Sequence, residues 1–137
     1  MSLFSLREVG MRYNGVQVLE GATLAFPQAQ FVAIAGPNGA GKSTLLGIMA
    51  GLRPNYTGAC LYAGKEVTEW PRRAFAREVC FLPQSVKMEF PFTAEQVVLM
   101  GRTPHCDGLF ESPEDWEAVE RAMARTDTLP FRGRDFR

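Results

Sequence analysis

The alternation of hydrophobic and polar residues at the start of the chain predicts a β-hairpin. Apolar and polar positions mix in a strand-like way from Leu3 to Tyr13, and a second strand is predicted from Gln17 to Phe26. The dipeptide Asn14-Gly15 between them favours a tight hairpin turn, because both residues tolerate positive φ. Pro27 then ends the second strand, since proline cannot donate to a ladder.

Two short apolar runs further along have the composition of buried strands. The first, Phe31 to Ala35, is continuous, as expected for a strand covered on both faces of a parallel sheet. It leads into a glycine-rich stretch and then into a predicted helix from Lys42 to Ala50, with Gly51 near the end of that helix. The second run, Val79 to Leu82, is cut off by Pro83.

The remaining elements are predicted from turn and capping signals. Thr93 and Gln96 have the spacing of a capping box, so a helix is expected from Ala94 to near Gly101. The remaining predictions are a strand or hairpin over Thr57–Val67, a short basic helix over Arg72–Arg77, a loop over Gln84–Phe92, and a helix that begins at Ser112-Pro113-Glu114-Asp115 and lasts to about Arg125.

Composition narrows the class of protein without naming a function. The 137 residues are 46% hydrophobic and carry 15 basic and 15 acidic side chains, which fits a compact domain and argues against disorder or a surface built for nucleic acid. No apolar run approaches the roughly 18 residues of a membrane-spanning helix. The three cysteines fit neither a disulfide framework nor a zinc site, so reduced thiols in a cytoplasmic protein are expected.

The glycine-rich stretch carries the strongest chemical signal. Gly36-Pro37-Asn38-Gly39-Ala40-Gly41-Lys42-Ser43 satisfies every constrained position of the P-loop pattern G-x-x-x-x-G-K-[ST]. In such a loop the glycines let successive backbone N–H groups point at phosphate oxygens, and the helix that follows adds its positive N-terminal end. Lys42 would reach the β- and γ-phosphates of ATP, and the Ser43 hydroxyl would coordinate Mg²⁺.

Continued through Thr44, Leu45 and Leu46, this motif resembles the ATP-binding subunits of ABC transporters. Tyr13 then resembles the aromatic residue of the family's A-loop, whose ring stacks on adenine, although it could be an ordinary strand aromatic. Gln84 resembles the Q-loop glutamine, which contacts Mg²⁺ and the attacking water, although it could be a simple loop residue. The resemblance implies that Val18 and Thr44 also contact the nucleotide.

The segment after Gln84 resembles the importers of iron–siderophore, haem and cobalamin. It contains Gly101-Arg102-Thr103-Pro104-His105, and in such proteins this region faces the membrane subunit. Met88, Phe90 and Phe92 could therefore form an exposed apolar patch for that partner, or alternatively a small core of their own. A metal site at His105 and Cys106 is not expected, because no further ligands stand at useful spacing.

The resemblance implies an α/β fold: a partial ABC-type P-loop NTPase core with an antiparallel β portion over residues 1–92 and the start of a helical subdomain over 93–137. No signature motif, Walker B strand or switch histidine is found, so we expect a shortened form of the domain that at most binds nucleotide and hydrolyses it negligibly.

The implied function is that of the ATP-binding subunit of an importer at the inner face of the membrane. Its implied cofactors are ATP and Mg²⁺, and its implied partners are a second ATP-binding subunit, arranged head to tail, and a membrane permease, with no nucleic acid. A soluble ABC-type ATPase of translation or DNA repair, or an inert fragment, remains the alternative.

Overall fold

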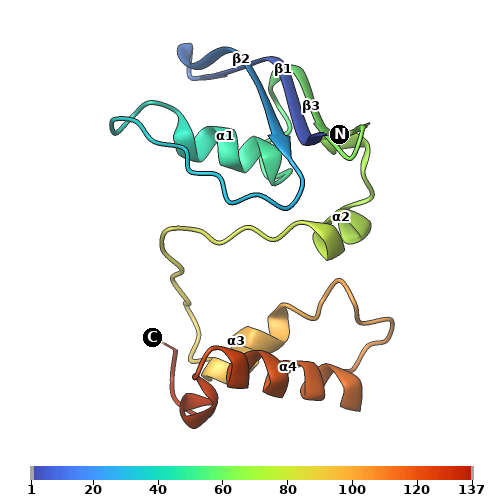
Figure 1. Cartoon of the computed structure of the whole chain (residues 1–137). Coiled ribbons are helices and arrows are strands. Elements are labelled where there is room, and N and C mark those ends of the chain that lie inside the picture. Colours follow the sequence, from blue (N-terminus) through green and yellow to red (C-terminus); the bar gives the residue numbers. More distant parts are fainter. Residues whose placement is uncertain (1, 137) are drawn as a thin grey trace. The chain divides into compact units, whose positions relative to one another are not determined.

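The computed structural model describes residues 2–136, which form two compact units that divide between Phe81 and Leu82. The N-terminal unit combines an antiparallel sheet with two helices, and the C-terminal unit is helical (Figure 1). We describe each unit by itself. The expected subdivision at residues 92 and 93 stays a prediction.

The sheet of the N-terminal unit is built on the predicted hairpin. Strands β1 (Ser2–Tyr13) and β2 (Val16–Pro27) pair antiparallel around Asn14-Gly15, with Tyr13 opposite Val16. Strand β3 (Thr57–Tyr62) pairs with the other edge of β1, and β4 (Lys65–Glu66) extends the sheet to the order β2-β1-β3-β4. The strand or hairpin predicted over Thr57–Val67 is a hairpin, with Ala63-Gly64 as the turn between β3 and β4.

Helix α1 (Lys42–Met49) packs against this sheet through one face (Figure 1). Leu45 and Ile48, three positions apart, are 5% and 0% exposed and join the buried residues of β1 and β3. Val67 of a short 3₁₀ turn (Val67–Glu69) and Phe75 of α2 (Arg72–Glu78) belong to the same core. There Tyr62 contacts Phe4, Trp70 and Phe75, with ring centroids 4.9, 5.5 and 5.5 Å away.

The two strands expected from the short apolar runs, the first of them in a parallel sheet, do not form in this structure. Residues 31–35 form no ladder, and Phe31 and Val32 are 99% and 47% exposed; Ile34 packs against the core. Residues 79–82 are likewise irregular, and Leu82 is 87% exposed. The physical reason is that a strand needs hydrogen-bonded neighbours. Within residues 2–136, the four strands of the sheet pair in the order β2-β1-β3-β4, and none of them pairs with either of these segments.

The C-terminal unit consists of two capped helices. Helix α3 (Ala94–Met100) begins with the predicted capping box of Thr93 and Gln96. Helix α4 (Pro113–Arg125) begins after Ser112, as predicted, and the structure shows a second capping box there, formed by Ser112 with Asp115. The Ala94 N–H, in the first turn of α3, also donates to the Arg134 carbonyl near the C-terminal end of the chain, at 2.9 Å. A short 3₁₀ turn (Leu129–Phe131) connects α4 to this segment.

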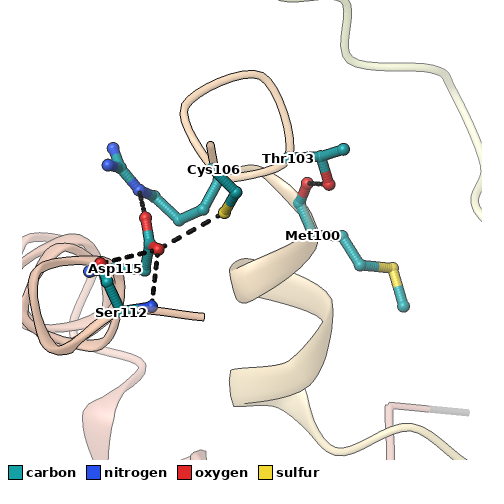
Figure 2. A network of polar contacts seen from close by, with 6 residues as sticks. Met100, Thr103, Cys106, Ser112 and Asp115 are labelled. Carbon is teal, nitrogen blue, oxygen red and sulfur yellow. Dashed lines mark hydrogen bonds and ion pairs between the residues drawn. The ribbon is translucent and has the colours of Figure 1, made fainter. Parts of the chain in front are cut away.

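Asp115 ties the start of α4 to the loop that follows α3. Its carboxylate accepts from the Arg102 Nε at 2.8 Å, from the Ser112 N–H at 3.0 Å and from the Cys106 thiol at 3.4 Å. Figure 2 shows Ser112 and Cys106 converging on the same carboxylate. Asp115 is buried, so these donors replace the water that it would otherwise bind. Arg102 of the Gly-Arg-x-Pro-His run therefore connects the loop after α3 to the first turn of α4.

The stability of the C-terminal unit should depend on pH through Asp115. The Ser112 N–H and then the Arg102 guanidinium hold the pKa of Asp115 well below its usual range. Because the folded-state pKa is the lower one, the stabilisation is complete above the unfolded pKa of about 3.9 and is lost as the pH falls below it. We expect urea midpoints, read from Trp116 fluorescence in Trp70→Phe, to fall between pH 6 and pH 3.

Asp115→Asn is the matched variant for this measurement. It keeps the shape of the side chain but removes the titrating group, so the urea midpoint should be lower at pH 6 and should change less with pH. Equal pH dependence in Asp115→Asn and in the Trp70→Phe parent would contradict the role assigned to this carboxylate.

Candidate functional site

The P-loop lies between the irregular segment 31–35 and α1. Residues 36–40 are exposed, and a turn within them is closed by a bond of 3.2 Å from the Ala40 N–H to the Pro37 carbonyl. Gly39 and Gly41 adopt left-handed φ values of 83° and 86°, which side chains with a Cβ rarely adopt. The pattern of glycines therefore matches the backbone that the loop requires, as the sequence predicts.

Lys42 places its ammonium group against the loop that precedes it. Its Nζ donates to the Gly36 carbonyl at 2.7 Å and to the Pro37 carbonyl at 2.6 Å. The side chain therefore folds back over the loop, so that the positive charge sits among the backbone groups that would surround a phosphate. An ammonium bound to two carbonyls keeps a third donor for an anion.

The start of α1 has the properties of an anion site. Gly41 is the N-cap, so no side chain caps the first N–H groups of this helix, and the first turn contains no acidic residue. Such N–H groups and the helix dipole favour negative charge. Ser43 is exposed in that first turn, whereas the neighbouring Thr44 is 8% exposed and so belongs to the packed face of α1.

The P-loop is held on strand β2 by a close approach at Gly41. A Cβ at Gly41 would lie 2.8 Å from the Val18 carbonyl oxygen and 2.8 Å from Leu19 Cδ2. A Cβ at Gly39, by contrast, would meet nothing within 4 Å. Gly41 therefore serves both the turn and the packing, whereas Gly39 serves the turn alone. This contact also places Val18, one of the predicted nucleotide residues, beside the P-loop.

Tyr13 lies at the end of β1, as predicted, and the residue is 37% exposed. It is connected to the P-loop through β2, since Tyr13 pairs with Val16 and Val18 lies against Gly41. Gln84 lies in an exposed, irregular stretch of the C-terminal unit. The structure thus brings together Tyr13, Val18 and the P-loop within one unit, while the expected role of Gln84 stays a prediction.

Sequence reasoning missed Arg53, which contacts Tyr13. Its guanidinium carbon lies 5.2 Å from the centre of the Tyr13 ring, and its Nη1 donates to the Tyr13 hydroxyl. The sequence carries no signal for this pair, because the two residues are 40 positions apart and Arg53 belongs to no motif.

The fit to a nucleotide rests on the phosphate end. The left-handed glycines, the Lys42 ammonium and the uncapped start of α1 suit phosphate, and the Ser43 hydroxyl is an oxygen ligand of the kind that Mg²⁺ accepts. Within residues 2–136, no cluster of three or more His, Cys, Asp or Glu side chains could hold a metal ion. His105 is exposed, and the three cysteines form no disulfide.

Alanine at the two left-handed glycines should separate the strain of the turn from the packing on β2. Each substitution forces a Cβ into left-handed backbone, at a cost of about 1–2 kcal/mol. At Gly41 the clash with Val18 and Leu19 adds about 1–3 kcal/mol, so Gly41→Ala should lower the free energy of unfolding distinctly more than Gly39→Ala. Urea unfolding read from Trp70 in a Trp116→Phe background measures this. Equal losses would contradict the contact.

The comparisons with known proteins agree with this geometry. A model of the ABC transporter family matches residues 19–136. The chain is 43% identical over 129 residues to the hemin import ATP-binding protein HmuV of Streptomyces coelicolor, covering 93% of this chain and 46% of that protein. It is 40% identical over 121 residues to the cobalamin import ATP-binding protein BtuD of Halobacterium salinarum, covering 88% of this chain and 30% of that protein.

The fold is also found in solved structures. An inward-facing conformation of a metal-chelate type ABC transporter matches with a TM-score of 0.75 at 20% identity, covering 98% of this chain and 48% of that one. This likeness confirms the predicted fold, a partial P-loop NTPase core of the ABC type. The chain spans about half the length, or less, of the curated relatives named above. The P-loop residues, the fold and the family match agree, and we conclude that the chain belongs to the ABC transporter family.

Proposed function

We propose that the N-terminal unit binds the triphosphate of ATP with Mg²⁺ in the P-loop. The observation that carries this proposal is the arrangement of Lys42 over the loop, beside the uncapped start of α1 and the two left-handed glycines. In the proposed complex Lys42 binds the β- and γ-phosphates, and backbone N–H groups of residues 38–44 bind the remaining phosphate oxygens. The Ser43 hydroxyl coordinates Mg²⁺.

The adenine end of the proposed site is Tyr13. Its ring is partly exposed, it ends the strand beside β2, and β2 carries the Val18 carbonyl that contacts Gly41. Stacking on an aromatic face suits any purine, because it uses the π-face and not the base edge. The site would therefore discriminate nucleotides by their phosphates more than by their base.

We further propose that this chain acts within the ATP-binding subunit of an importer for haem, cobalamin or an iron chelate. The names of the relatives, a hemin and a cobalamin import protein, support this choice over a soluble ATPase of translation or DNA repair. ATP binding would close two such subunits head to tail, and that closure would drive a membrane permease. The location that follows is the inner face of the membrane.

The proposed contact with the permease is the apolar surface of the C-terminal unit. Phe90 is 65% exposed and its ring lies 6.4 Å from that of Phe92, so these rings form no closed core of their own. Phe92 also lines a pocket of about 430 Å³ with Met100 of α3 and Trp116 of α4. No helix within residues 2–136 is long and apolar enough to cross a membrane, so the proposed subunit would reach the membrane through its partner.

Replacing Lys42 should abolish most nucleotide binding. Hydrogen bonds to charged groups contribute about 1.5–3 kcal/mol, so Lys42→Ala should weaken MgATP binding by roughly 10- to 100-fold. Isothermal titration calorimetry of the chain measures this, with circular dichroism to check the fold. Lys65→Ala is the matched control, because Lys65 carries the same charge in the same unit but lies over Trp70. Unchanged affinity in Lys42→Ala, or an equal loss in Lys65→Ala, would contradict the proposal.

The importer assignment has its own test. Tagged protein should be recovered from detergent-solubilised membranes together with a permease of the same transport system, and Phe90→Asp should reduce that recovery, since it places a charge on the proposed apolar contact. Lys87→Ala, a nearby substitution in the same loop, is the control. Recovery with ribosomes or DNA in place of a permease would favour the soluble ATPase.

A further inference from the structure

Arg53 lies across the helix that starts at the P-loop. The turn after α1 places it there, since the Leu52 N–H donates to the Gly47 carbonyl at 2.9 Å. The Arg53 side chain then covers Gly47: a Cβ at Gly47 would lie 2.8 Å from Arg53 Nε and 3.0 Å from Arg53 Cδ. The absence of a side chain at Gly47 therefore provides the space in which Arg53 lies.

From this position Arg53 reaches the Tyr13 ring. The guanidinium carbon lies over the ring at 5.2 Å from its centre, and Nη1 donates to the Tyr13 hydroxyl. These two contacts fix different features of the tyrosine: the hydroxyl bond fixes the end of the ring, and the cation–π contact favours one orientation of its face. Tyr13 as a whole nevertheless remains 37% exposed.

The contacts of Arg53 give Tyr13 a second structural connection to the P-loop, in addition to strand β2. On one side, Tyr13 is connected to the P-loop by β2, through the Val16 pairing and the approach of Val18 to Gly41. On the other side, it is connected to the same loop by α1, through Gly47 and Arg53. Two independent connections restrict the ring relative to the phosphate site more than the strand alone would.

We propose that Arg53 is a positioning residue that holds the Tyr13 ring ready to stack on the purine base of the bound nucleotide. Arg53 takes one face and the hydroxyl end of the ring, and the base takes the remaining face. This inference rests on the proposed nucleotide binding and adds a residue that acts through Tyr13. Arg53 itself contacts neither the phosphates nor the metal ion in this arrangement.

The test compares a ligand that has a base with one that has none. Affinities of the chain for MgATP and for magnesium tripolyphosphate are measured by calorimetry in the wild type and in Arg53→Ala. Loss of a cation–π contact and a hydrogen bond should weaken MgATP binding roughly 3- to 10-fold, with tripolyphosphate binding unchanged. In a Tyr13→Ala background, Arg53→Ala should cause no further loss. Arg53→Lys should rescue the affinity in part, since lysine keeps the charge but not the planar fork.

Gly47→Ala tests the same idea without removing the charge. Its Cβ displaces the Arg53 side chain, while alanine suits the helix better than glycine, so the fold should be retained and the loss should again be confined to MgATP. Arg7→Ala, an exposed arginine of β1, is the charge control and should leave both affinities unchanged.

The outcomes distinguish a failure of the proposed nucleotide binding from a failure of the proposed role of Arg53. A wild-type chain that binds neither MgATP nor tripolyphosphate overturns the proposed function, and the role of Arg53 with it. A wild-type chain that binds both, with Arg53→Ala equal to wild type or equally weakened for both ligands, overturns the role of Arg53 alone. An additive loss in the Tyr13→Ala background would also overturn it, because Arg53 would then act without the ring.

Discussion

The close approach of Gly41 to strand β2 is the constraint on which the N-terminal unit depends. It joins the P-loop to the sheet at the one point where a left-handed residue without a side chain lies against the Val18 carbonyl and Leu19. Helix α1 starts at the next residue, so the same contact fixes where that helix begins and allows Leu45 and Ile48 to reach the core. The contact of Gly41 with β2 therefore positions both the P-loop and the buried face of α1.

Local signals in the sequence predicted most of the elements. The Asn14-Gly15 hairpin, the helix after the P-loop, the capping box at Thr93 and the helix start at Ser112 are confirmed, because each is specified by residues within a few positions of one another. The strands expected at the two short apolar runs did not form, because a strand depends on residues far away in the sequence. The apolar composition of residues 31–35 and 79–82 does not specify a partner strand. A segment becomes a β-strand only when it forms hydrogen bonds with such a partner.

The site was predictable to the same extent. The P-loop follows from a local pattern, and the position of Tyr13 at the end of β1 follows from the hairpin. The contacts that hold these parts were not predictable, because they join distant residues: Arg53 with Tyr13, and Gly41 with Val18. Arg102 shows the same limit in the C-terminal unit, since the motif identified the residue but not its buried partner Asp115.

An amide and tyrosine-ring NMR titration of the chain with MgATP shows whether the P-loop, β2 and Tyr13 form one nucleotide site. We expect the largest shifts on the N–H groups of residues 38–44, on Val18 and on the Tyr13 ring, all with one dissociation constant. Shifts confined to the C-terminal unit, or shifts of the P-loop and the Tyr13 ring with different dissociation constants, would contradict it.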